Sequence, residues 1–177
     1  MRSLVEAARE GDASAWEHIY VCLYPRLLSY ARRELDLETA RDAVSEAMLR
    51  AAGALPRFSW KGAGFEAWLF RILRHVLVDT HRGTGRRRRL EATAPKELDH
   101  PEADDALIAD EEARLVRRAF ARLAPADQEL LHLRVVAGLS ADEVGHILGK
   151  RPGAVRMAQS RSLERLRAAL VEEGSWS

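Results

Sequence analysis

Cysteine is almost absent from the 177-residue sequence, and long apolar runs are missing altogether. The single Cys22 cannot form an internal disulfide, and the N-terminal residues lack the basic segment and apolar run of a secretion signal. No stretch of about 20 apolar residues could span a membrane. These absences exclude a disulfide scaffold and predict a cytoplasmic protein without membrane insertion. The apolar neighbours Val21 and Leu23 predict a buried, inert thiol for Cys22.

The common motifs of catalytic and metal sites are missing as well. The sequence has no zinc-binding helix of the metalloprotease kind, no phosphate-binding glycine loop, no cysteine pair and no nucleophilic serine elbow. Its six histidines are scattered, and only His75, set between arginines near an aromatic loop, suits a recognition role. These absences leave no candidate catalytic site, and the sequence predicts no metal or cofactor.

Strand-like alternation is absent too, and apolar residues recur instead at steps of three and four. This period predicts an all-α protein in two compact units. In the N-terminal half, Asp12 and Asp36 are placed to begin helices, Pro25 should kink or divide the first of these, and Pro56 should follow the end of the second. A third, strongly apolar helix is predicted for residues 65–81.

Charge is distributed unevenly along the chain. Residues 1–90 carry 16 basic and 11 acidic side chains, residues 91–112 carry 1 and 9, and residues 113–177 carry 11 and 7. Basic faces on two units favour a polyanion such as nucleic acid, and two ordinary solvated surfaces are the alternative. The acidic segment contains Pro95 and Pro101 and few large apolar residues, so it is predicted to be a linker.

Residues 139–170 predict a helix-turn-helix. Ser140 and Glu143 form a capping box that begins the first helix, Gly149 suits the left-handed residue that ends it, and Pro152 suits the first turn of the second helix. At about 100° per residue, the second helix has one face for packing and one that could meet a groove. The packing residues are Val155, Ala158, Ser162, Leu166 and Ala169, and the outward residues are Arg156, Met157, Ser160, Arg161, Glu164 and Arg167. Alone, such a hairpin fits a packed bundle corner as well as a DNA reader.

The loop before residue 65 combines aromatic and cationic side chains, namely Arg57, Phe58, Trp60 and Lys61. Aromatic rings interleaved with cations can stack on unpaired bases while the charges hold the backbone. The alternative is that Phe58 and Trp60 fold inward as core residues. The sequence leaves both possibilities open.

Seven segments agree in type and order with one known family. They are residues 8–12 (AREGD), 30–33 (YARR), 40–49 (ARDAVSEAML), 65–72 (FEAWLFRI), 123–128 (LAPADQ), 138–144 (GLSADEV) and 153–156 (GAVR). Each segment is weak alone, but their order along nearly the whole chain is specific. The chain resembles the extracytoplasmic-function (ECF) group of bacterial RNA polymerase sigma factors.

This resemblance implies a division of labour along the chain. Residues 1–90 would form a region 2-like domain that binds core RNA polymerase and that recognises and melts the −10 element. Residues 91–110 would be the acidic linker, and residues 111–177 would form a region 4-like helix-turn-helix domain that reads the −35 element. The implied partners are core RNA polymerase, promoter DNA and, as a further candidate, an anti-sigma factor.

The resemblance also implies three sets of binding residues. Those for core polymerase are Asp42, Ser45, Glu46 and Leu49. Those for the opened −10 strand are Phe58, Ser59, Trp60, Lys61, Phe65, Arg71, Arg74 and His75. Those for the −35 groove and its phosphates are Arg134, Arg151, Arg156, Met157, Ser160 and Arg161. Four positions depart from the residues usual in the family and bear on docking and sequence preference: Ser45, His75, Arg151 and Ala158.

Two other classes of protein fit the sequence. One is a transcriptional regulator whose helix-turn-helix binds an operator while the N-terminal helices sense or dimerise. The other is a structural helical adaptor. Promoter-specific transcription with core RNA polymerase separates the classes, because neither alternative would give it.

Overall fold

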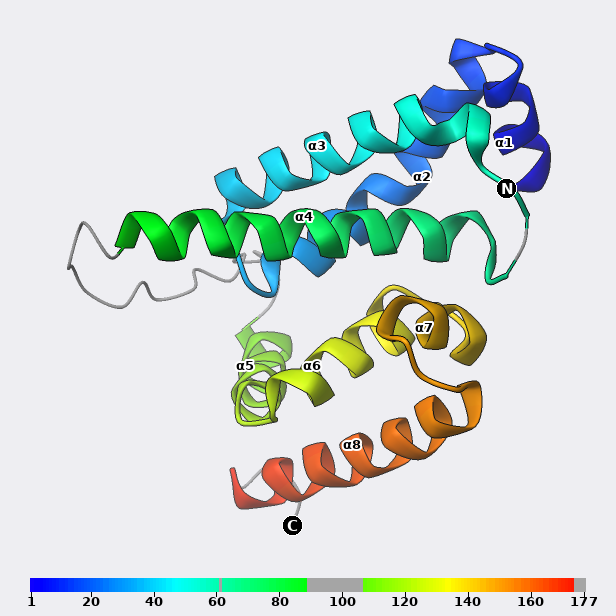
Figure 1. Ribbon diagram of the computed structural model, residues 1–177. Helices are drawn as coiled ribbons and strands as arrows, with labels where there is room; N and C mark the ends of the chain where they lie inside the picture. Colours follow the sequence, from blue (N-terminus) through cyan, green and yellow to red (C-terminus); the bar gives the residue numbers. More distant parts are fainter. Residues whose placement is uncertain (61, 89–106, 174–177) are drawn as a thin grey trace. The chain divides into compact units, whose positions relative to one another are not determined.

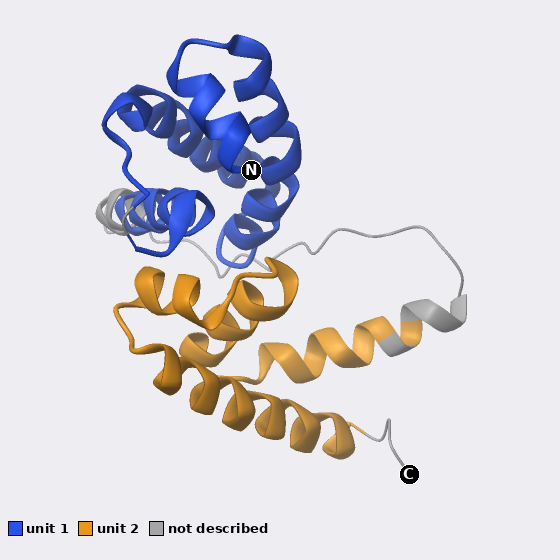
Figure 2. Ribbon diagram, turned by 90° about the vertical axis from the view of Figure 1, so that its right-hand side faces the viewer, with its two compact units in different colours: residues 1–100 blue, residues 101–177 orange. Residues whose placement is uncertain are grey.

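The computed structural model describes residues 1–60, 62–88 and 107–173 (Figure 1). Within these ranges the chain forms helices and no strands, which confirms the predicted all-α class. It divides into two compact units, residues 1–100 and residues 101–177 (Figure 2). Lys61 and most of the predicted linker lie outside the described residues.

The first unit consists of the helices α1 (Arg2–Arg9), α2 (Ala13–Arg32), α3 (Leu37–Ala54) and α4 (Gly64–Arg88), with a short 3-10 turn η1 (Leu55–Arg57) before the loop that leads to α4. Helix α3 packs along both α2 and α4, and α1 packs on α2. The largest buried side chains include Tyr30 and Phe70, whose rings meet edge to face with centroids 5.7 Å apart. These contacts join α2 to α4 in the centre of the unit.

The predicted helix starts of this unit are confirmed. The Asp12 carboxylate accepts hydrogen bonds from the backbone N–H groups of Ser14 and Ala15 at 2.9 and 3.2 Å. The bond from the Ser14 hydroxyl and the backbone bonds together hold the pKa of Asp12 below its usual value. Asp36 caps α3 in the same way, accepting from the Thr39 N–H at 3.0 Å.

The structure bears on two predictions for α2. Of the two effects predicted for Pro25, division of the run is excluded, because Pro25 lies inside the single helix Ala13–Arg32, and a kink stays a prediction. Pro25 has no N–H to donate to the carbonyl of Val21. Val21 is 65% exposed, so water can reach this side of the helix. Cys22 is exposed rather than buried. The buried stripe of α2 runs through Ile19 and Leu23, and Cys22 lies about 60° and 100° away from them around the helix.

The second unit consists of α5 (Leu107–Ala121), α6 (Pro125–Leu131), a π-helical turn η2 (His132–Val136), α7 (Ala141–Leu148) and α8 (Pro152–Glu172). Helix α8 packs against α5, α6 and α7. Four fully or almost fully buried side chains form the centre of this core: Leu130, Leu133, Leu139 and Val144. No helix in the described part of the chain is long and apolar enough to cross a membrane.

Candidate nucleic-acid interface

The turn between α7 and α8 has the predicted geometry. The Ser140 N–H donates to the Glu143 carboxylate at 2.7 Å, and the Glu143 N–H donates to the Ser140 hydroxyl at 3.2 Å. Gly149 takes the left-handed conformation with φ +67°, and Pro152 is the first residue of α8. A Cβ atom at Gly145 would lie 2.6 Å from the carbonyl oxygen of Lys150, so the turn that folds back onto α7 requires glycine there.

Helix α8 has the two faces expected from its period. Val155 and Ser162 are completely buried, whereas Arg156, Ser160 and Arg161 are exposed and Met157 is 60% exposed. Arg151, the residue before the helix, is exposed too. Five of the six residues predicted for the −35 element therefore lie on α8 or directly before it. The sixth, Arg134, lies in η2.

Arg134 is half-buried and already engaged. Its Nε donates to the side-chain oxygen of Gln159 at 2.8 Å, and its Nη1 donates to the backbone carbonyl of Leu139. Arg134 lies in the π-helical turn η2 and thus ties this turn and the residue that precedes the N-cap of α7 to α8. Its predicted contact with DNA phosphates stays a prediction.

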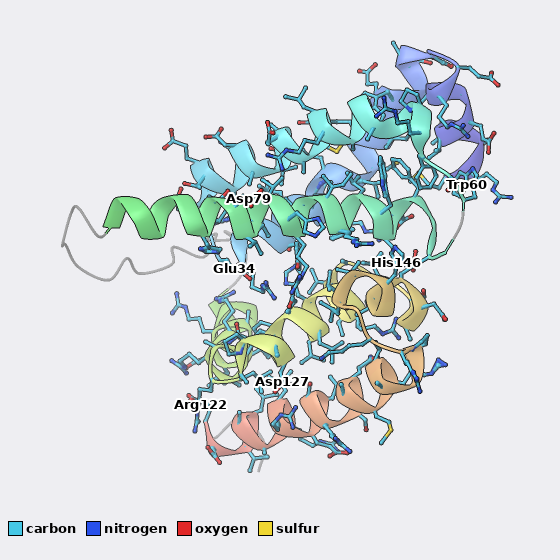
Figure 3. The ribbon with its side chains drawn as sticks, viewed as in Figure 1. Glu34, Trp60, Asp79, Arg122, Asp127 and His146 are labelled. Carbon is cyan, nitrogen blue, oxygen red and sulfur yellow. The ribbon has the colours of Figure 1, made fainter. Side chains whose placement is uncertain are left out.

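A polar clasp that the sequence analysis missed fixes α8 on α6. Asp127, in the first turn of α6, accepts from Arg165 Nη2 at 2.6 Å and from Arg165 Nε at 2.9 Å (Figure 3). The buried Ser162 hydroxyl donates to the same carboxylate at 2.7 Å. The bonds from Arg165, with a contribution from Ser162, hold the pKa of Asp127 below its usual value. Ser162 and Arg165 are one turn apart, but nothing local in the sequence pairs them with Asp127.

The aromatic loop of the first unit is folded largely inward. Phe58 is 7% exposed and Phe65 is 2% exposed, and their rings meet edge to face at 5.5 Å. Trp68 lies against both rings, at 5.0 and 5.4 Å. Burial leaves neither phenylalanine a free ring face for a base, which favours the alternative that Phe58 folds inward as a core residue and disfavours a contact of Phe65 with the −10 strand.

Trp60 differs from its neighbours in this loop. It is half-buried, and its ring meets Phe58 edge to face at 5.1 Å. Its Nε1–H donates to the Glu6 carboxylate at 2.6 Å, and the Arg2 guanidinium lies over its ring at 4.6 Å from the centroid (Figure 3). Stacking on a base is therefore a prediction for Trp60 alone. Ser59 beside it is exposed.

The remaining −10 candidates lie on α4. Arg71 and His75 are exposed, four residues apart on the same side of the helix, and Arg74 is half-buried. The opposite side carries the buried Leu69 and Leu73. Arg71 and His75 thus lie together on the exposed face of the amphipathic helix α4.

The predicted polymerase-binding residues all lie on the outer face of α3. Asp42, Ser45 and Glu46 are exposed, and Leu49 is 69% exposed. Glu46 accepts from Arg50 Nε at 2.7 Å, and Arg50 Nη1 lies 3.7 Å from Asp79 on α4. Arg50 is a further residue of this face that the sequence analysis missed, and it connects α3 to α4.

Comparison with known proteins defines the class of the chain. Residues 19–87 match Sigma-70 region 2, and residues 119–168 match region 4 of Sigma-70. The fold and these two regions define a sigma-70 family protein. The chain is 36% identical to the ECF RNA polymerase sigma factor ShbA of Streptomyces griseus, over 94% of this chain and 93% of that protein. It is 34% identical to SigD of Mycobacterium tuberculosis, over 99% and 86%. The chain belongs to the ECF RNA polymerase sigma factors.

Solved structures agree on the fold. CnrH, determined in complex with the cytosolic domain of CnrY, superposes with a TM-score of 0.70 at 24% identity, over 97% of each chain. RpoE of Bartonella quintana, determined in complex with the anti-sigma factor NepR, gives 0.69 at 23% identity, over 87% of this chain and 95% of that one.

Proposed function

We propose that this protein binds core RNA polymerase, directs it to promoters with specific −35 and −10 elements, and helps to open the −10 duplex. The observation that carries the proposal is the two-faced helix α8, which is packed through Val155 and Ser162 and exposes Arg156 and Arg161. The region 2-like domain is proposed as residues 1–90, the linker as 91–110 and the region 4-like domain as 111–177.

The second unit reads the −35 duplex through α8. Arg156 and Arg161 each offer a forked pair of donors that suits guanine in the major groove, and Met157 offers apolar contact with a thymine methyl group. Ser160 and Arg151 are proposed to contact base edges or phosphates beside them. The clasp between Asp127 and Arg165 supports this proposal, because it fixes the orientation of α8 on α6.

The first unit holds the opened −10 strand. The exposed Arg71 and His75 face is proposed to meet the strand, with Arg74 contributing charge and Trp60 supplying a ring for one unpaired base. An unpaired base exposes both its faces, and a duplex does not. A stacking ring therefore favours the open promoter over the closed one.

The outer face of α3 is the proposed dock for core polymerase. Asp42, Glu46 and Leu49 combine two exposed carboxylates with an exposed apolar side chain on one helix face. The protein is proposed to act as a binding subunit and not as an enzyme. Its proposed location is the cytoplasm, where the polymerase is. An anti-sigma factor is proposed as a further partner that would compete with these surfaces.

The test is transcription with purified core RNA polymerase and genomic fragments. We expect short transcripts from a small set of start sites that share sequences about one to two helical turns apart upstream, and we expect none from core polymerase alone. A regulator would bind duplex DNA without supporting transcription, and an adaptor would do neither. A variant with Arg156→Ala and Arg161→Ala should keep binding core polymerase while losing the choice of start site.

A further inference from the structure

Two side chains of α1 converge on Trp60 from far away in the sequence. Glu6 accepts the indole N–H at 2.6 Å across 54 residues, and the Arg2 guanidinium covers the ring at 4.6 Å. Arg2 and Glu6 are one helical turn apart, so both lie on the same side of α1. Between them Val5 is completely buried, and it anchors α1 on the first unit.

Trp60 needs such contacts because its own segment gives it little direction. Residues 58–60 follow the turn η1 and belong to no helix. A tryptophan on such a segment can adopt several rotamers that differ in where the plane of the ring lies. The Nε1–H group lies at one edge of the indole, so a bond from it to a fixed carboxylate selects one orientation of the ring.

The charges at this site are arranged to suit a polyanion. A lone carboxylate beside a stacking ring would repel the phosphates of a bound strand. The Arg2 guanidinium lies over the same ring and offsets the charge of Glu6. The indole is thus held by an acid and a base together, with the edge of Phe58 as its third contact.

We infer that α1 is part of the site for the opened −10 strand, with Glu6 and Arg2 acting as positioning residues that orient Trp60 for stacking on an unpaired base. The inference rests on the proposed function. It assigns a role in promoter opening to the first helix, which lies before the matched region 2 at residues 19–87. A purely structural contact would affect folding but would not depend on the chemistry of the Trp60 edge.

The experiment measures opening with the full chain bound to core polymerase. Permanganate reactivity of −10 thymines is recorded on a closed promoter and on a template mismatched at −10, and binding to −35 duplex is measured beside it. The variants are Glu6→Ala, Glu6→Gln, Arg2→Ala, Trp60→Phe, Trp60→Ala and the double variant Glu6→Ala with Trp60→Phe. Glu10→Ala is the matched control, because Glu10 is an exposed carboxylate just after the other end of α1.

We expect Glu6→Ala to lower opening of the closed promoter roughly tenfold, the size expected for loss of one charge-assisted hydrogen bond. Glu6→Gln should keep most of the activity, since its amide oxygen accepts the same bond. Trp60→Phe keeps an aromatic ring without the N–H donor, so it should match Glu6→Ala, and the double variant should be no worse than either. Arg2→Ala should lower opening by a smaller factor than Glu6→Ala does. Its effect should be larger at low salt than at high salt. Glu10→Ala, −35 binding and the melting temperature should stay unchanged.

Three results would overturn the inference. The first is normal opening by Glu6→Ala when Trp60→Ala is defective, which leaves the proposed function intact. The second is a full additional loss from Glu6→Ala in the Trp60→Phe background. The third is an equal loss of opening, −35 binding and melting temperature, which makes the contact structural. Failure of the wild-type protein to direct any transcription would instead remove the proposed function, and the inference with it.

Discussion

The two regions proposed to contact DNA are built differently. In α8 the contacting residues are exposed on a helix whose other face is buried and held by the clasp from Asp127 to Arg165. In the loop before α4 most of the aromatic surface is buried, and the one ring left half-exposed, Trp60, is bound to α1. A duplex reader can be rigid and fully presented before DNA arrives. The ring proposed to hold an unpaired base is half-buried and oriented by its contacts with α1.

This difference predicts which changes should affect binding and which should affect opening. A site built on a packed helix keeps its geometry when one exposed side chain is removed. A site on a loop depends on the neighbours that orient it. Changes on α8 should therefore alter sequence preference, and changes around Trp60 should alter opening.

The largest expected effect comes from the outer face of α3, the proposed dock for core polymerase, on which promoter recognition and opening both depend. Reversing the charges of Asp42 and Glu46 to arginine should weaken binding to core polymerase by at least about 2 kcal/mol, since like charges would replace opposite ones at the dock. Gel filtration with core polymerase measures the loss as missing co-elution. Both residues are exposed, and the Glu46–Arg50 ion pair that is lost lies on the surface, so the unfolding free energy should change by no more than about 1 kcal/mol.

The control for this variant is Glu10→Arg with Glu17→Arg, which changes the charge equally at two exposed acids of the same unit. It should still co-elute with the polymerase. The charge-reversal variant of Asp42 and Glu46, measured without polymerase, should also keep its binding to −35 duplex DNA. Unfolding of that variant would show that the α3 face supports the fold, and the polymerase dock would have to lie elsewhere.

The second effect concerns the loop. Trp60→Ala should reduce opening of a closed promoter by about 1–3 kcal/mol, the value of one base stacked on an aromatic ring. A template already mismatched at −10 should recover part of the loss, since the cost of separating the strands is removed in advance. Permanganate footprints on both templates measure this. Equal footprints from wild type and variant on the closed template would make Trp60 a packing residue.

How far the sequence predicted these regions follows from their geometry. The two faces of α8, the capping box at Ser140 and the left-handed Gly149 were all predicted, because helix period and cap chemistry are local properties. Cys22 was misplaced because its adjacent apolar neighbours were weighed above its angle around α2. Pro25 does not divide α2, because a helix tolerates proline where the freed carbonyl faces water.

The contacts that orient the two sites could not be predicted, because they join distant segments. Asp127 pairs with Arg165 across 38 residues, and Glu6 pairs with Trp60 across 54. Nothing in either local sequence distinguishes these acids from solvated ones. The loop posed a further difficulty, since side chains outside helices have no period, and the burial of Phe58 depends on where Trp68 places its ring.

The third effect separates base reading from general affinity on the α8 side. Arg156→Ala should cost about 1–3 kcal/mol of discrimination at one or two base pairs of the −35 element, because a bidentate contact with a base edge is lost. Arg134→Ala should weaken binding to all sequences alike, since Arg134 holds Gln159 and Leu139 in place. Binding to single-substituted duplexes measures both. Uniform loss with Arg156→Ala would place that residue on a phosphate.

The smallest effect tests the clasp that makes α8 rigid. Bonds from Arg165 and Ser162 depress the pKa of Asp127, so the ionised carboxylate stabilises the folded state above its unfolded pKa of 3.8 and loses this contribution as the pH falls through the folded value. Asp127→Asn should lower the unfolding free energy by about 1 kcal/mol at pH 7, discounted because Arg165 is half-exposed. The difference from wild type should shrink below about pH 4. Glu164→Gln, at an exposed acid in the middle of α8, is the control and should show neither effect. Denaturant unfolding between pH 7 and pH 3 measures both. A gap that stays constant with pH would mean that the clasp acts through packing and not through charge.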